Sequence, residues 1–77
     1  MKRAKAESQF VVCIHNEGYA ASLELRKIYQ TIPDAAAATR RFLRVVDESG
    51  EDYLYPDNFF MPIELPQKLE KVLATAA

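Results

Sequence analysis

The segment from Asp47 to Phe60 constrains the fold of this chain more than any other part of it. Its sequence is DESGEDYLYPDNFF. The Ser-Gly pair among charged residues is a turn signal, and a second turn signal, Pro-Asp-Asn, follows a few residues later. The aromatic and β-branched residues before, between and after these turns favour strands. The segment therefore predicts three short strands that reverse direction at each turn, as in a small β-barrel.

Similar short runs of β-branched and aromatic residues recur along the chain and predict five strands in all. The expected strands cover residues 10–14, 27–32, 41–46, 52–55 and 59–65. Pro62 lacks the amide that a ladder needs, so the last strand is expected at an edge or a bulge. Gly50 is expected to adopt a positive φ in the turn between the third and fourth strands. Residues 19–25 fit either a helical turn or an irregular loop.

Two helical segments are expected beside the strands. Asp34 is a good N-cap for the four alanines that follow it, which predicts a turn or two of helix. Pro66 stands in the favoured first position of a C-terminal helix. One apolar stripe runs along that helix and contains Leu65, Leu69, Val72 and Leu73. We expect the stripe to pack on the barrel of the same chain, as in a monomer; a seam between two copies is the alternative.

Length and composition predict one globular domain in the cytoplasm. Of the 77 residues, 49% are hydrophobic and 27% are charged, as in ordinary globular proteins. The expected division is a disordered basic tail over 1–8, a barrel over 9–65 and a helix over 66–77. No apolar run is long enough to span a membrane, and the run after the basic N-terminus is too short for a signal peptide. The single cysteine, Cys13, excludes an internal disulfide.

The run Tyr55-Pro-Asp-Asn-Phe-Phe60 resembles the closing signature of SH3 domains. In that family a proline, a small polar residue, an asparagine and an aromatic residue form a short 3₁₀ turn before the last strand, and a hairpin precedes it. The resemblance covers the last third of the barrel and implies an SH3-like barrel of five strands with a C-terminal helix. As a whole, the chain also resembles short bacterial proteins that carry such barrels.

The resemblance further implies a groove for proline-rich peptides. Pro56 and Phe59 would help to line this groove, and Asn58 would hold the turn. The chain has no tryptophan, although the groove of the SH3 family depends on one. It also lacks the alanine-leucine-tyrosine-aspartate-tyrosine motif of the family's first strand.

We therefore expect a non-catalytic protein-interaction module that needs no cofactor. The candidate contact residues are Tyr53, Tyr55, Pro56, Asn58 and Phe59. This hypothesis requires that the aromatic rings among them form an exposed patch. The nearby acids Asp47, Glu48, Glu51 and Asp52 fit a solvated turn, where pKa values stay ordinary.

Two other kinds of site are weighed against this hypothesis. If the strands pair as expected, Arg40, Arg41 and Arg44 lie near Tyr29, Tyr53 and Tyr55. Arginines beside exposed aromatic rings are typical of platforms that bind single-stranded nucleic acid. The net charge of −1 gives only a weak electrostatic footprint. Cys13 and His15 share one face of a strand, yet zinc usually needs three or four protein ligands, and the chain has no further cysteine or histidine.

Overall fold

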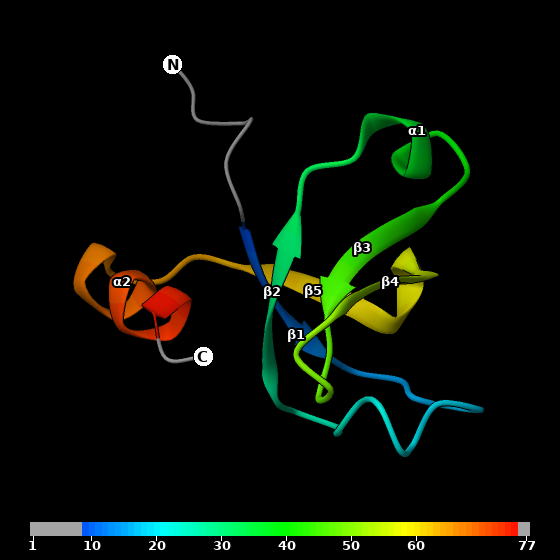
Figure 1. Cartoon of the computed structure of the whole chain (residues 1–77), viewed down its shortest axis with the longest axis horizontal. Helices are drawn as coiled ribbons and strands as arrows, with labels where there is room; N and C mark the ends of the chain where they lie inside the picture. Colours follow the sequence, from blue (N-terminus) through cyan, green and yellow to red (C-terminus); the bar gives the residue numbers. More distant parts are fainter. Residues whose placement is uncertain (1–8, 76–77) are drawn as a thin grey trace.

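Five antiparallel strands form one sheet in the order β4-β3-β2-β1-β5 (Figure 1). The computed structural model describes residues 9–75, so the predicted disordered tail over 1–8 lies outside the described residues. The strands are β1 Gln9–Cys13, β2 Ile28–Ile32, β3 Phe42–Val46, β4 Asp52–Pro56 and β5 Phe60–Ile63. The helical elements are α1 Ala35–Ala38, the 3₁₀ turn η1 Asp57–Phe59 and α2 Gln67–Thr75. The expectation of a mainly β fold with a C-terminal helix is confirmed.

The strand β1 lies between the second and the last strand, because it pairs with β2 on one side and with β5 on the other. β4 and β5 are the two edges of the sheet, and Pro62 lies on the edge strand β5 as predicted. No ladder joins β4 to β5 within residues 9–75. The chain bridges this gap with η1.

Backbone hydrogen bonds tie η1 to two other parts of the sheet. The carbonyl of Phe59 accepts hydrogen bonds from the amides of Ile14 and His15 at 2.8 and 3.2 Å. The amide of Asp57 donates to the carbonyl of Arg41 at 2.9 Å. The turn between β4 and β5 is therefore fixed to the end of β1 and to the start of β3.

The core lies on the face of the sheet that the β1–β2 loop covers. It consists of Val11, Cys13, Leu23, Tyr29, Val45, Tyr55 and Phe60. Leu23 comes from the loop and is fully buried. The segment that the sequence left ambiguous is thus a series of turns with one side chain anchored in the core, where burying a leucine stabilises by about 1.5–3 kcal/mol.

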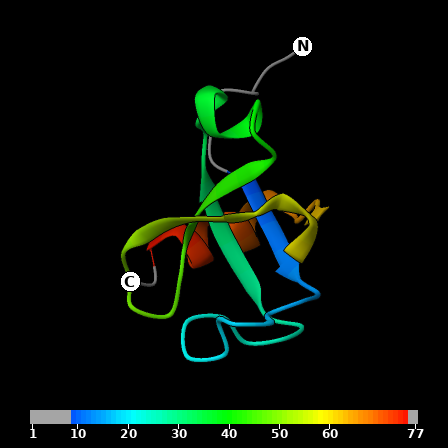
Figure 2. The same ribbon diagram turned by 90° about the vertical axis from the view of Figure 1, so that its right-hand side faces the viewer.

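The helices and the long loop lie on different sides of the sheet. α1 and the β1–β2 loop are at opposite ends of the molecule, and α2 lies behind β2 and β1 (Figure 2). Leu73 of α2 lines a cavity of about 300 Å³ together with Phe10 and Ile28, whereas Leu69 is 40% exposed. Leu73 is therefore a member of the predicted apolar stripe that faces the sheet.

Gly50 has a φ of +86° in the β3–β4 turn, which confirms the predicted positive φ. No atom lies within 4 Å of the position that a Cβ would occupy, so a side chain there is penalised by backbone conformation alone. We predict that Gly50→Val destabilises the fold by about 1–3 kcal/mol. Gly50→Asn should cost much less, because asparagine tolerates the left-handed region. Urea denaturation measures both losses, and equal losses would contradict this explanation.

Candidate binding surface

Asp47 anchors the β3–β4 turn through a buried carboxylate. Its Oδ1 accepts hydrogen bonds from the amide and hydroxyl of Ser49 at 2.8 and 2.6 Å, and its Oδ2 accepts one from the hydroxyl of Tyr55 at 2.6 Å. An aspartate that bonds the amide two residues ahead is a common turn device. Here the same side chain is only 6% exposed and also reaches into the core.

The expectation of a solvated turn with ordinary pKa values is therefore wrong for Asp47. Burial opposes ionisation of Asp47, but the hydrogen bonds from Ser49 and Tyr55 outweigh it and lower the pKa of this carboxyl. Burial, together with the hydrogen bond to Asp47, raises the pKa of Tyr55 to about 12. The carboxylate stays ionised and the phenol stays neutral around neutral pH.

Glu48, the next residue, is also engaged. Its Oε2 lies 2.7 Å from Nζ of Lys27 and accepts a hydrogen bond from the hydroxyl of Tyr29 at 2.5 Å. The hydrogen bond from Lys27, followed by that from Tyr29, lowers the pKa of Glu48. Tyr29 is buried, and burial followed by the hydrogen bond to Glu48 raises its pKa. This acid therefore joins the end of the hairpin to β2.

Three aromatic rings from separate segments meet above the Asp47 anchor. The ring of Tyr19, from the β1–β2 loop, lies 5.0 Å from that of Tyr55 and 5.9 Å from that of Phe59, edge-on to both. Such edge-to-face pairs are favourable beyond the area they bury. Tyr19 is nevertheless 41% exposed. The loop thus places a ring at the surface on top of a buried one.

An open cavity of about 390 Å³ lies beside these rings. It is lined by Tyr19, Ser22, Asp47, Ser49, Tyr53, Leu54 and Tyr55. Tyr53 is 50% exposed, and its hydroxyl donates to Glu51 at 3.0 Å. The cavity therefore combines tyrosine side chains from the β1–β2 loop and from β4 with one buried carboxylate.

The five candidate contact residues occupy different environments. Tyr53 and Asn58 are exposed, Pro56 and Phe59 are half-buried, and Tyr55 is 3% exposed. Tyr55 therefore does not meet the requirement of an exposed ring, because its ring is buried beneath that of Tyr19.

Tyr19 was missed by the sequence reasoning because it lies in a segment without clear periodicity. The one available signal was an aromatic residue directly after the turn at Gly18. We use the term aromatic surface for the partly exposed rings of Tyr19, Tyr53 and Phe59.

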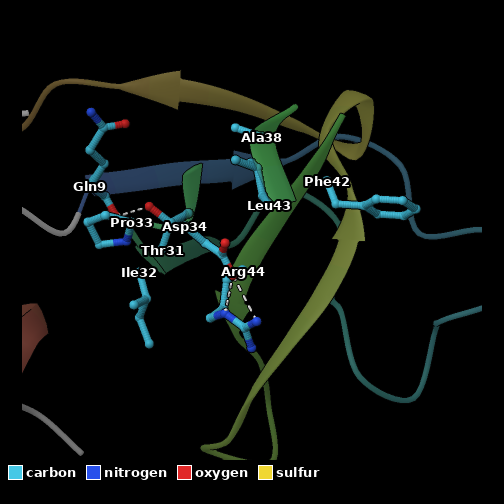
Figure 3. A pocket seen from close by; sticks show the side chains of 9 residues that line it. All are labelled: Gln9, Thr31, Ile32, Pro33, Asp34, Ala38, Phe42, Leu43 and Arg44. Carbon is cyan, nitrogen blue, oxygen red and sulfur yellow. Dashed lines mark hydrogen bonds and ion pairs between the residues drawn. The ribbon is translucent and has the colours of Figure 1, made fainter. Parts of the chain in front are cut away.

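Arg44 is neutralised within the fold, which weakens the nucleic-acid hypothesis. Its guanidinium lies beside a cavity of about 140 Å³ between α1 and the strands (Figure 3). Nη2 lies 2.8 Å from Oδ2 of Asp34, and Nη1 lies 3.0 Å from Oδ2 of Asp52. Asp34 also caps α1 as predicted, accepting the amide of Ala37 at 3.0 Å.

The remaining arginines and the tyrosines of the proposed nucleic-acid platform differ in their exposure. Arg40 and Arg41 are exposed. Of the three tyrosines that the hypothesis needed as stacking surfaces, Tyr29 and Tyr55 are buried, and Tyr53 is exposed. The structure therefore does not bring the three arginines and the tyrosines together on one exposed face.

Cys13 and His15 also lie in different environments. Cys13 is fully buried, its thiol donates to the carbonyl of His15 at 3.2 Å, and burial raises the pKa of that thiol. The His15 imidazole is exposed and lies 3.5 Å from the Glu17 carboxylate. Within residues 9–75, no group of three or more histidine, cysteine or acidic side chains is placed to hold a metal ion.

No protein-family model, curated protein or solved structure matches this chain. Neither helix of the described part is long and apolar enough to cross a bilayer. The function is therefore inferred from the geometry of the chain's own side chains.

Replacing Tyr55 by phenylalanine tests the buried anchor. Tyr55→Phe leaves the Asp47 carboxylate with one donor fewer, so we predict a loss of about 1.5–3 kcal/mol in the free energy of unfolding at neutral pH. The folded pKa of Asp47 is lowered, so the stabilisation is present above the unfolded pKa and is lost as pH falls through the folded pKa. The difference from wild type should therefore shrink below about pH 4.

The matched control is Tyr53→Phe, which removes an exposed hydroxyl from the same strand. Urea denaturation between acid and neutral pH measures both variants. Tyr53→Phe should leave stability nearly unchanged. A Tyr55→Phe loss as small as that of Tyr53→Phe would show that the buried hydrogen bond does not stabilise the hairpin.

Proposed function

We propose that this domain is a non-catalytic protein-interaction module that binds an extended peptide of a partner protein across the aromatic surface. The observation that carries the proposal is the position of Tyr19, which packs edge-on against Tyr55 and Phe59 while 41% of it stays exposed. Exposed aromatic rings held by neighbours are typical of binding surfaces, because little side-chain entropy is lost on contact. Tyr53, which lines the same cavity as Tyr19, extends the surface along β4.

The chemistry of the nearby groups supports binding rather than catalysis. The Asp47 carboxylate accepts three internal hydrogen bonds and has a lowered pKa, which makes it a poor general base. The Cys13 thiol is fully buried and its pKa is raised, which makes it a poor nucleophile.

An SH3-like architecture is part of the same proposal. The strand order and the 3₁₀ turn between β4 and β5 are compatible with it. Pro56 precedes that turn, and Phe42 lies directly opposite Pro56 in the ladder with 37% of its area exposed. Phe42 thus places an aromatic ring beside Pro56 in a chain without tryptophan. We also propose a cytoplasmic location, since the one cysteine of the chain is a free thiol.

Selection from a random-peptide display library, followed by fluorescence anisotropy with the selected peptides, tests the proposal. Tyr19→Ala should weaken binding by about tenfold or more, as for truncation of a central aromatic contact. The matched control is Met61→Ala, which removes another exposed apolar side chain, from β5. It should leave affinity unchanged, and both variants should remain folded at the temperature of the binding assay.

Two results would contradict the proposal: selection of no peptide, or equal effects of Tyr19→Ala and Met61→Ala on affinity. Labelled single-stranded RNA and DNA at low salt form the comparison, because phosphate contacts are strongest there. Nucleic-acid binding that is lost in an Arg40→Ala, Arg41→Ala double variant would favour the alternative function.

A further inference from the structure

The cavity beside the aromatic surface has features that the proposed peptide binding does not explain. Its volume of about 390 Å³ falls within the range of about 300–1,000 Å³ typical of small-ligand pockets. Tyr19 and Tyr53 line it and are 41% and 50% exposed, and the ring of Tyr19 rests edge-on against the buried ring of Tyr55. The exposed faces of tyrosine rings attract cations through their negative potential.

The carboxylate in this cavity has no cationic partner of its own. Asp47 is 6% exposed, and its three hydrogen-bond donors, from Ser49 and Tyr55, are neutral. Among the described residues, Lys27 pairs with Glu48 and Arg44 with Asp34 and Asp52, and no ion pair involves Asp47. The lowered pKa keeps this group ionised. A negative charge without a counter-ion therefore lies against an open pocket.

We propose that this cavity binds a quaternary ammonium group, carried by a trimethylated lysine of the bound peptide. The inference rests on the proposed function for the source of the ligand, but the chemistry of the cavity is independent of it. The tyrosine rings supply cation–π contacts and apolar area for the methyl groups, and Asp47 supplies the opposite charge.

The hydrogen bonds already made in the cavity distinguish this ligand from other cations. Ordinary ammonium and guanidinium groups lose water on binding and need acceptors for their N–H groups. Both oxygens of Asp47, the carboxylate that lines the cavity, already accept internal hydrogen bonds. A trimethylammonium group has no N–H to satisfy. The cavity offers negative potential but few free acceptors, which favours this group.

Titration of the isotope-labelled protein with choline, followed by NMR of the tyrosine rings, tests the chemistry of the cavity. The neutral comparison is dimethylbutanol, in which a quaternary carbon replaces the nitrogen of choline. Choline should shift the signals of Tyr19 and Tyr53, and the neutral isostere should bind at least about tenfold more weakly. N-acetyl trimethyllysine amide should behave like choline, and its unmethylated counterpart like the isostere.

Two substitutions locate the site. Tyr53→Leu should weaken choline binding about three- to tenfold, while Tyr53→Phe retains the ring and should retain binding. Phe42→Leu is the matched control, because Phe42 is an exposed ring that lines a different cavity. It should leave choline binding unchanged. Tyr53 is exposed, so these variants are expected to fold.

Each other outcome overturns a defined part of the proposal. Equal binding of choline and dimethylbutanol, or no shift with either, would show that the cavity does not recognise cations. Choline binding without trimethyllysine binding would rule out the lysine source. If choline binds but Tyr19→Ala leaves peptide affinity intact, the cation site stands and the proposed peptide surface fails.

Discussion

One hydrogen bond, from the hydroxyl of Tyr55 to the buried carboxylate of Asp47, connects the parts of this small fold that are proposed to bind ligands. It joins the β3–β4 turn to the far end of β4, and it fixes the ring of Tyr55 in the core. Tyr19, which lies 36 residues earlier in the β1–β2 loop, packs on that ring. In a chain of 77 residues the apolar core is small. A buried hydrogen bond of this kind therefore contributes much to holding the hairpin in place.

Burying a carboxylate is costly unless donors replace its water. Ser49 and Tyr55 provide three donors, and all of them are neutral. The arrangement satisfies the hydrogen-bonding capacity of Asp47 without cancelling its charge. Asp47 therefore stabilises the hairpin and also supplies negative potential to the adjacent cavity.

The elements were predictable from the sequence because their signals are local. Alternating apolar residues, the Asp34 cap, the glycine at position 50 and the proline at position 62 each act through the neighbouring backbone. The candidate site depends on contacts between distant segments instead. Tyr19 is positioned by its contacts with Tyr55 and Phe59. Arg44 forms ion pairs with Asp34 and Asp52, so its charge is not available to nucleic acid. The burial of Asp47 could not be predicted for the same reason. An aspartate just before a Ser-Gly pair is typical of a solvated turn, and the contact with Tyr55 is not evident from the local sequence.

NMR titration of the Asp47 side-chain carboxyl carbon tests the central claim most directly. If neutral donors hold a buried, ionised carboxylate, its midpoint should lie below the ordinary aspartate value of about 3.9 and should rise in Tyr55→Phe. A midpoint at or above the ordinary value, or one that Tyr55→Phe does not move, would contradict the account. In that case Asp47 would be neither the anchor of the hairpin nor the source of charge in the cavity.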